Sequence, residues 1–298
     1  MRIGLTGASG FIGSAIIEAA NDAGHEVIGF SRNPAKIIPG TEEVRGFADP
    51  ENSDYKGLDA MIHLAGESLL GIWTKKKKDR IYSSRVDGTD ALVKGLAKLP
   101  EADRPGVLVA ASAVGYYGDS GDAPLDEESD HGFGFLARVV QGWENAAMTA
   151  EKEYDIRTVT PRIGFVLGSN GGAMPILRKV FKACLGGKLG NGKQWMPWVH
   201  VKDVAGIFLE SVVNSNLRGP VNCVGPDQVR NIDFTKTLAG AVNRPAILPV
   251  PAFALKRLPG GMSEMFLSSL RVEPVVMRLT DFEWQFDELD DAIYASLS

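Results

Sequence analysis

The chain has 298 residues, of which 44% are hydrophobic and 23% charged, and its formal net charge is −5. This composition is typical of a globular protein with a sizeable core. The small negative charge argues against binding to nucleic acid or to an anionic membrane. Two cysteines cannot make a disulfide framework. No signal sequence and no long apolar run is recognisable, so we expect a cytoplasmic protein.

The start of the chain predicts a strand over residues 2–6, a glycine-rich turn and a helix over residues 11–23. The turn reads Gly7-x-x-Gly10-x-x-Gly13, which is typical of a dinucleotide-binding site when it lies between a strand and a helix. A glycine-rich turn without a ligand is the alternative. The candidate cofactor-binding residues of this segment are Thr6, Gly7, Gly10, Phe11, Ile12 and Gly13.

The end of the second expected strand, over residues 25–30, indicates which dinucleotide is bound. NAD-binding domains place Asp or Glu about 20 residues beyond the glycines, to hold the ribose 2′-hydroxyl. This chain has Ser31 and Arg32 there. A hydroxyl and a guanidinium suit a 2′-phosphate, so the sequence predicts NADP(H). If Arg32 is an ordinary surface residue, the sequence still predicts a dinucleotide-binding site but no longer favours NADP(H) over NAD(H).

Further strands are expected near 43–47, 59–64, 106–112, 157–163 and 220–224, and helices over 75–98, 135–153, 173–185, 203–214 and 233–242. This alternation predicts an α/β fold, a Rossmann-type doubly wound parallel sheet with helices on both faces. We expect a dinucleotide-binding domain over residues 1–165, completed by the strand near 220–224. A smaller C-terminal α/β lobe should span residues 166–298. Ligands of such sheets bind beyond the carboxyl ends of the strands.

Longer motifs carry a resemblance to a known family. The glycine-rich turn, His63-Leu64-Ala65-Gly66, and Ser112 ahead of Tyr116-Tyr117 together resemble the extended short-chain dehydrogenase/reductase superfamily. Other motifs are similar to its atypical "epimerase family" branch, and the segment 245–298 resembles that branch's small C-terminal domain. These motifs contain Trp73, Ser84-Arg85, Trp143-Glu144, Arg162-Ile-Gly164 and Gln194-Trp195-x-x-Trp198-Val-His200.

The resemblance implies two further groups of site residues. Leu64, Ala65, Gly66, Arg85 and Arg162 are expected at the cofactor. The glycine-rich segment 186–200 is expected to form the substrate rim. Its candidate substrate residues, together with one from an earlier loop, are Trp73, Gln194, Trp195, Trp198 and His200. Packing between domains is the alternative role for the tryptophans, and a structural hydrogen bond is the alternative for His200.

The chain departs from the superfamily at the catalytic residues. Catalytic members carry a serine and a Tyr-x-x-x-Lys pair on the following helix, where the tyrosine moves the proton. Counting back from Glu144, Leu136 and Val140 occupy the tyrosine and lysine positions. The candidate catalytic residues are therefore Ser112, Tyr117 and Tyr116, each of which could instead have only a structural role.

Two functions from different classes follow. The first is an NADP(H)-dependent oxidoreductase or epimerase-like enzyme that acts on a small hydroxyl or carbonyl substrate. The second is a non-catalytic NADP(H)-binding redox sensor or regulatory protein. We expect no metal site, because the histidines lack ligand spacing, and no nucleic acid or membrane partner. The protein should be a monomer or homodimer. The run 75–78 of four lysines reads as a solvated helix face that could also meet an anionic ligand, and the acidic stretch 119–130 reads as an exposed loop.

Overall fold

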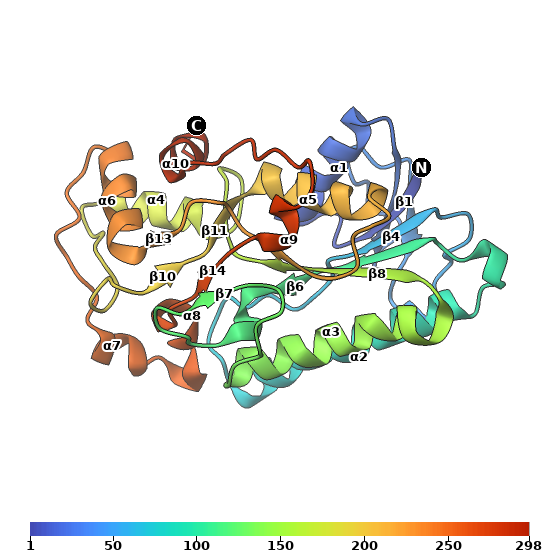
Figure 1. Cartoon of the computed structure of the whole chain (residues 1–298), viewed down its shortest axis with the longest axis horizontal. Helices are drawn as coiled ribbons and strands as arrows, with labels where there is room; N and C mark the ends of the chain where they lie inside the picture. Colours follow the sequence, from blue (N-terminus) through green and yellow to red (C-terminus); the bar gives the residue numbers. More distant parts are fainter. Residues whose placement is uncertain (298) are drawn as a thin grey trace.

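A parallel sheet of eight strands forms the centre of the computed structural model, which describes residues 1–297 (Figure 1). The strand order is β3-β2-β1-β4-β5-β8-β12, and β6 also pairs with β8. All pairings in this sheet are parallel, which confirms the predicted doubly wound Rossmann-type fold. Its strands are β1 (Arg2–Thr6), β2 (Glu26–Ser31), β3 (Glu43–Gly46), β4 (Ala60–His63), β5 (Val107–Ala110), β6 (Ser112–Ala113), β8 (Arg157–Ile163) and β12 (Gly219–Cys223).

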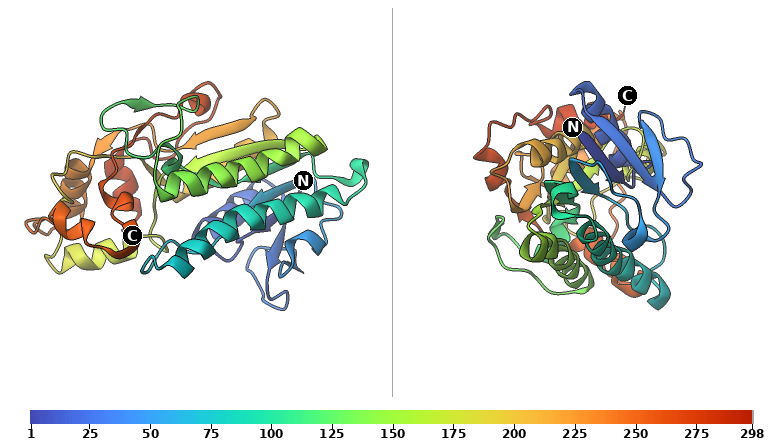
Figure 2. Two further views of the ribbon diagram at one scale, coloured as in Figure 1. Left: turned by 90° about the horizontal axis from the view of Figure 1, so that it is seen from below. Right: turned by 90° about the vertical axis from the view of Figure 1, so that its right-hand side faces the viewer.

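Helices cover both faces of the sheet. α1 (Phe11–Asp22) and α5 (Val201–Val213) pack together on one face, and α2 (Lys75–Ala97) and α3 (Phe135–Tyr154) run side by side on the other (Figures 1 and 2). Because the central strands are buried on both faces, they read as continuous apolar runs rather than alternating ones. Met61 of β4 and Leu108 of β5, for example, are both fully buried.

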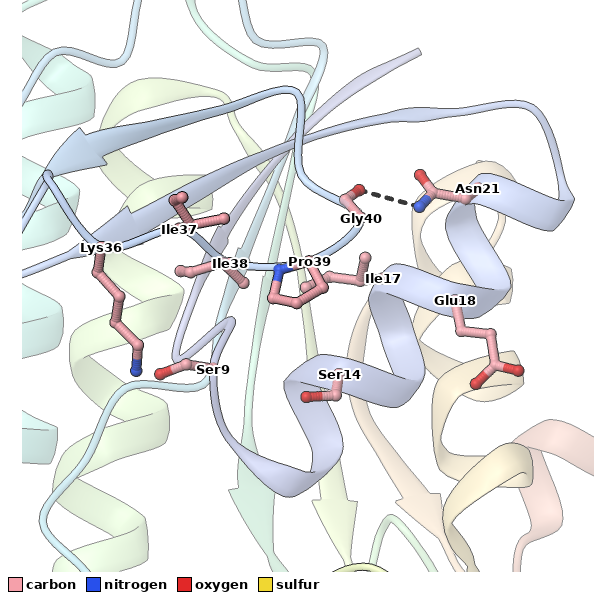
Figure 3. A pocket seen from close by; sticks show the side chains of 10 residues that line it. All are labelled: Ser9, Ser14, Ile17, Glu18, Asn21, Lys36, Ile37, Ile38, Pro39 and Gly40. Carbon is pink, nitrogen blue, oxygen red and sulfur yellow. Dashed lines mark hydrogen bonds between the residues drawn. The ribbon is translucent and has the colours of Figure 1, made fainter.

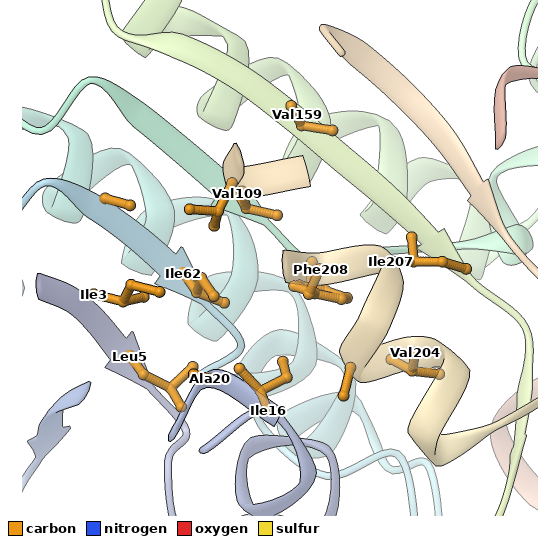
Figure 4. Close-up of a cluster of buried hydrophobic side chains, with 14 of the residues drawn as sticks. Ile3, Leu5, Ile16, Ala20, Ile62, Val109, Val159, Val204, Ile207 and Phe208 are labelled. Atoms are coloured by element: carbon orange, nitrogen blue, oxygen red, sulfur yellow. The ribbon is translucent and has the colours of Figure 1, made fainter. Parts of the chain in front are cut away.

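The two helical layers each close an apolar core against the sheet. Figure 4 shows the core under α1 and α5, where strand residues such as Ile3 and Ile62 meet Ile16 of α1 and Phe208 of α5. On the opposite face, α2 and α3 bury Leu92, Leu96, Ala147 and Ala150. Burying an aliphatic or aromatic side chain stabilises a fold by about 1.5–3 kcal/mol. The two cores therefore hold the strands in place, and with them the carboxyl ends of the strands, where ligands are expected.

The remaining segments build a smaller lobe beyond the carboxyl ends of the strands (left in Figure 1). Its core contains Trp198, Phe181, Leu238 and Ile293, all buried. Its helices are α4 (Met174–Lys182), α6 (Asn231–Ala241), α7 (Ala252–Lys256), α8 (Glu264–Leu267) and α10 (Leu289–Ala295). α9 (Val275–Arg278) instead packs against β12, and its Met277 belongs to the core under α1 and α5. Its paired short strands are β9 (Phe165–Leu167) with β11 (Trp198–His200), β10 (Trp195–Met196) with β13 (Val229–Arg230), and β7 (Pro124–Leu125) with β14 (Arg271–Val272). Single turns of 3-10 helix lie at η1 (Pro50–Asn52), η2 (Glu101–Asp103), η3 (Val114–Tyr117) and η4 (Pro259–Gly261).

The chain passes twice between the sheet and the lobe. It leaves the sheet after β8, builds β9 and α4, and returns with α5 and β12 before it completes the lobe. The strand expected near 220–224 is therefore present as β12, beside β8. α4 ends three residues before the predicted boundary, because Cys184 has a left-handed backbone with φ of 58°.

Within residues 1–297, no helix is both long and apolar enough to cross a lipid bilayer. The same residues contain no group of His, Cys, Asp and Glu side chains that could hold a metal ion.

Candidate functional site

The glycine-rich turn lies where the strand order reverses, between β1 and β4. Gly7 has a φ of +68°, which favours glycine, and its carbonyl accepts a hydrogen bond of 2.9 Å from the amide of Gly10. A Cβ atom at Gly13 would lie 2.3 Å from that carbonyl oxygen, so α1 can approach the turn only without a side chain there. α1 has no side-chain cap and no acidic residue in its first turn. Its first amides are free to bind an anion.

Thr6 and His63 end β1 and β4 and hold the next loop in place. The hydroxyl of Thr6 accepts hydrogen bonds from the amides of Leu64 (3.0 Å) and Ala65 (3.1 Å). Since both lone pairs of the hydroxyl are then used, its proton is donated to Nδ1 of His63, 2.8 Å away. His63 therefore carries its own proton on Nε2, which has no hydrogen-bond partner among the described residues. Burial, and then the nearby charge of Arg85, lower the pKa of His63 to about 4.

This buried histidine predicts a pH-dependent stability. In the unfolded chain His63 takes up a proton below its ordinary pKa of 6.5, whereas the folded protein resists protonation down to about pH 4. Its contribution to stability is therefore lost as the pH falls from about 6.5 to 4, by about 3 kcal/mol in total. His63→Asn keeps an acceptor for Thr6 but does not titrate. We expect chemical denaturation to show a smaller loss of stability across this range for the variant than for the wild type.

Two other buried groups titrate in the same range, so the comparison with the variant is essential. Burial lowers the pKa of His200 to about 4, which adds to the loss at low pH. Burial raises the pKa of Asp203 to about 6, which has the opposite effect, because its ionisation destabilises the fold as the pH rises. Equal pH dependence in wild type and His63→Asn would contradict the assignment of His63 as a neutral buried group.

The end of β2 presents the residues expected at the ribose. The Ser31 hydroxyl accepts a hydrogen bond from the amide of Asn33, and Arg32 is exposed and forms no ion pair within residues 1–297. A cavity of about 500 Å³ lies between α1 and the loop 36–40 (Figure 3). Ser9 of the glycine-rich turn and Lys36 both line it. A hydroxyl and an ammonium group thus lie near the turn, in addition to the predicted Ser31 and Arg32.

The loop after β4 rests on Arg85. The guanidinium donates a 2.9 Å hydrogen bond to the carbonyl of Glu67 and lies 5.1 Å from the ring centre of Trp143. A Cβ atom at Gly66 would lie 3.3 Å from the guanidinium carbon, so the loop passes directly over it. Burial lowers the pKa of Arg85 to about 10. The structure thus places Leu64, Ala65 and Gly66 at the switch point, with Arg85 beneath them.

Phe11 and Ile12 occupy the first turn of α1. The Phe11 ring lies against the backbone of Gly168 and Gly171, where added Cβ atoms would approach it to 2.6 and 2.4 Å. Ile12 is partly buried against the core. The turn is therefore held from the lobe side as well as by β1.

A buried ion pair lies beyond the end of β5. Arg162 of β8 donates to both carboxylate oxygens of Glu144, with Nε–Oε1 of 2.8 Å and Nη2–Oε2 of 2.9 Å. The Ser112 hydroxyl donates a 2.5 Å hydrogen bond to the same Oε1 atom. Burial acts to lower the pKa of Arg162, but its hydrogen bonds and charge interaction with Glu144 outweigh this effect and raise it. Arg162 is therefore a permanent cation that faces Glu144.

The two tyrosines after Ser112 have different surroundings. Tyr117 is 2% exposed, accepts a hydrogen bond from Arg162 (2.8 Å) and donates one to Oδ1 of Asn222 (2.7 Å). Burial raises its pKa to about 12. Tyr116 is partly exposed, and the guanidinium carbon of Arg162 lies 3.6 Å from the centre of its ring. No hydrogen bond to its hydroxyl occurs within the described residues.

The helix α3 presents apolar residues where a tyrosine and a lysine are usual in the superfamily. A Cβ atom added to Gly115, in the turn after Ser112, would lie 3.4 Å from Leu136 and 4.0 Å from Val140. Both positions thus face the turn that carries Tyr116 and Tyr117. Neither side chain can transfer a proton.

The acidic segment 119–130 is largely exposed, as its sequence predicts, but two of its carboxylates have partners elsewhere in the chain. Glu127 is 7% exposed, and its Oε1 accepts hydrogen bonds from the amides of Asn222 and Val276. Burial raises its pKa. Asp122 accepts from the indole of Trp195 at 2.8 Å and forms an ion pair with Arg230. The segment therefore joins the sheet to the lobe, because its carboxylates find partners that are distant in the sequence.

The five candidate substrate residues do not lie at one rim. Trp198 is fully buried in the lobe core, and His200 is 4% exposed. Nδ1 of His200 caps α5 by accepting from the amide of Lys202. The Gln194 side chain donates to the carbonyls of Leu189 and Phe266.

The remaining two differ in burial: Trp195 is half-buried, whereas Trp73 is only 2% exposed. The Trp195 ring lies 4.3 Å from the guanidinium carbon of Arg230. Trp73 lines a second cavity, described below, and its indole donates to the carbonyl of Leu69.

Several residues at these sites lie outside the set that the sequence reasoning selected. They are Glu144, Glu127, Asn222, Ser9 and Lys36. Glu144 belongs to one of the motifs that carry the family resemblance. Its position among the apolar residues on the buried face of α3 is the signal that could have identified it as a site residue. No local sequence pattern marks Asn222 or Glu127, because they contact each other across 95 residues of the chain.

Comparison with known proteins agrees with this arrangement. The model of the NAD dependent epimerase/dehydratase family matches residues 3–222, and that of a domain of unknown function, DUF1731, matches residues 250–295. The chloroplastic SDR39U1 homologue of Arabidopsis thaliana is 36% identical over 99% of this chain and 86% of its own length. Epimerase family protein YfhF of Bacillus subtilis is 34% identical over 98% of this chain and 97% of its own.

A solved structure extends the likeness to three dimensions. Human epimerase family protein SDR39U1 (isoform 2), crystallised with NADPH, matches with a TM-score of 0.91 at 32% identity and covers 100% of this chain and 99% of that one. NADPH is the form of dinucleotide that Ser31 and Arg32 predict for this chain. With a family model matched over most of its length and relatives aligned from end to end, the chain belongs to the NAD-dependent epimerase/dehydratase family, in the epimerase-family branch that carries the DUF1731 domain.

Proposed function

We propose that the protein binds NADP(H) at the carboxyl edge of the sheet, between β1 and β4. The observation that carries this proposal is the uncapped start of α1 beside the turn at Gly7, where Gly13 leaves room for close packing. Free helix amides beside a glycine turn suit a pyrophosphate. The NADPH in the human relative supports the same assignment.

The 2′-phosphate would lie beyond the end of β2. Arg32 is exposed and has no internal ion-pair partner in the described chain, so its charge is available to a ligand. Ser31 supplies a hydroxyl, and Lys36 a second positive charge from the following loop. Phosphate oxygens accept strong, charge-assisted hydrogen bonds from such groups.

The reaction that fits this site best is oxidation or reduction of a small hydroxyl or carbonyl compound. A bound nicotinamide supplies hydride chemistry, and the protein must position the substrate oxygen and exchange its proton. Ser112 gives its own proton to Glu144, so it can accept a hydrogen bond from a substrate hydroxyl. Tyr116 is the proposed proton donor, because its hydroxyl is not engaged within the described residues, unlike that of Tyr117.

Tyr116→Phe and Tyr117→Phe form a matched pair that tests this assignment. We expect Tyr116→Phe to reduce turnover of a carbonyl substrate by about 100-fold or more, since general acid catalysis contributes about 10²–10⁴-fold. NADPH binding should be unchanged. Tyr117→Phe removes the buried hydroxyl that accepts a hydrogen bond from Arg162 and donates one to Asn222, so it should mainly lower the thermal midpoint. Nicotinamide absorbance and calorimetric binding measure the two effects.

A non-catalytic NADP(H)-binding sensor is the second candidate. It is favoured by Leu136 and Val140, which place apolar side chains beside Gly115. If NADPH binds but is not oxidised by any of a broad panel of aldehydes and ketones, the sensor is preferred. If turnover occurs and survives unchanged in both tyrosine variants, the proton-donor assignment fails.

A further inference from the structure

A second cavity lies at the first turns of α2 and α3, apart from the glycine-rich turn. Its volume is about 840 Å³, within the range of small-molecule sites. Both helices begin at the same end of the molecule, next to the lobe (Figure 2). The lining residues are Trp73, Lys75, Lys78, Asp79, Tyr82, Ser83, Phe135, Arg138 and Gly260.

The cavity carries an excess of positive charge. Three cations, Lys75, Lys78 and Arg138, line it together with a single carboxylate, that of Asp79. None of the three cations forms an ion pair within residues 1–297. Neighbouring cations behave differently, since Lys77 and Arg80 both pair with Glu67. Lys76, which lies outside the cavity on the same helix turn, forms no ion pair in the described chain either, so the matched variants below must separate the cavity from the rest of this helix end.

The ring of Phe135, which is 9% exposed, lies next to two of the cations. The amino group of Lys78 lies 4.9 Å from the ring centre of Phe135, and the guanidinium carbon of Arg138 lies 5.9 Å from the same centre. The Trp73 ring meets Phe135 edge to face at 5.4 Å. Cations held beside an aromatic ring can contact an anion while the ring contacts a flat apolar group.

The C-terminal tail closes one side of the cavity. Gly260 has a φ of +79°, and a Cβ atom there would lie 2.0 Å from the carbonyl oxygen of Trp73. The tail is therefore seated closely on the loop before α2. Three segments distant in the sequence thus form the walls, which makes the cavity a feature of the tertiary structure.

We propose that this cavity binds a small molecule that carries an anionic group, phosphate or carboxylate, on a flat apolar body. Lys78 and Arg138 contact the anion, and Phe135 contacts the apolar body. Lys75, an exposed lining residue, adds long-range attraction. None of the residues that line this cavity is assigned to the proposed NADP(H) site, so each proposal is tested on its own residues.

Calorimetric titration of the full chain with phenyl phosphate and with benzoate, at low ionic strength, tests the proposal. The two probes distinguish phosphate from carboxylate, and benzyl alcohol serves as the uncharged control. We expect at least one anionic probe to bind with a Kd of about 1 mM or tighter. Binding should weaken as salt is added, since exposed charges are screened. Failure of both anionic probes to bind, or equal binding of benzyl alcohol, overturns the proposal.

Matched variants locate the binding. Lys78→Ala combined with Arg138→Ala should weaken the anionic probe about tenfold or more. Lys76→Ala removes an exposed charge from the same helix turn, outside the cavity, and should change the affinity less than about twofold. Phe135→Leu should weaken phenyl phosphate but not inorganic phosphate. If Lys76→Ala weakens probe binding as much as the double variant does, the probe is attracted by the general surface charge, and the proposal is overturned.

NADPH titration of the same variants is the internal control. Because α1 and the end of β2 lie outside this cavity, NADPH affinity should be unchanged in all of them. Retained NADPH binding also shows that a variant is folded. Loss of probe binding together with intact NADPH binding is the expected result. Normal probe binding in the double variant overturns the assignment of the cavity, whatever the outcome for NADPH.

Discussion

Arg162→Met is expected to lower the free energy of unfolding by about 3–5 kcal/mol, because it leaves the Glu144 carboxylate buried without its cation. Arg162 has a side-chain exposure of 3% and Glu144 of 11%, and two hydrogen bonds join them. The substitution also removes the donor to Tyr117 and the cation under the Tyr116 ring. A loss of this size approaches the total stability of many domains. Urea denaturation followed by circular dichroism measures it.

Two further variants separate the ion pair from simple loss of a large side chain. Glu144→Leu combined with Arg162→Met removes both charges, so it should be less destabilising than Arg162→Met alone. Arg218→Met breaks an exposed pair with Glu151, where Arg218 has a side-chain exposure of 60%, and should cost less than about 1 kcal/mol. If Arg162→Met is no more destabilising than Arg218→Met, the buried network does not stabilise the fold as described.

The sheet was predictable because its strands are buried on both faces. Segments such as residues 60–63 and 107–110 are continuous apolar runs, and the helices between them have a clear period. The predicted ends of β1, β8 and α3 agree with the structure to within one residue. The glycine-rich turn was equally visible, since its conformation is a local property of Gly7.

The short strands of the lobe were not predicted. β7 and β14 are two-residue strands that pair only with each other, although they lie far apart in the chain. Nothing in two residues distinguishes such a strand from a loop. The same reason explains Glu127, whose partner amides belong to Asn222 and Val276. Long-range contacts of this kind leave no periodic signal in the sequence.

Site residues were harder to place than elements. The pattern Gln194-Trp195-x-x-Trp198-Val-His200 predicts a substrate rim, yet Trp198 lies in the lobe core and His200 caps α5. Sequence indicates which residue types are present but not which face of a short strand points inward. Ser112 follows β5, as the sequence predicts, and begins β6, while its hydrogen bond to Glu144 depends on the packing of α3 on the sheet.

Affinity for NADPH compared with NADH tests the central claim most directly, and Arg32→Asp is the variant to measure beside the wild type. The 2′-phosphate is the only chemical difference between the two cofactors, and Arg32 carries an unpaired charge at the end of β2. A charge-assisted hydrogen bond contributes about 1.5–3 kcal/mol, so we expect NADPH to bind about 10- to 100-fold more tightly than NADH. In Arg32→Asp the added carboxylate repels the phosphate, so this preference should disappear or reverse.

Arg244→Asp is the matched control, because it reverses an exposed charge in the lobe and changes the net charge equally. Nicotinamide fluorescence and calorimetry should show NADPH preference in the wild type and in Arg244→Asp, and none in Arg32→Asp. Comparable binding of NADH and NADPH by the wild type would contradict the 2′-phosphate site. Absence of binding by either cofactor would contradict the proposed dinucleotide site itself.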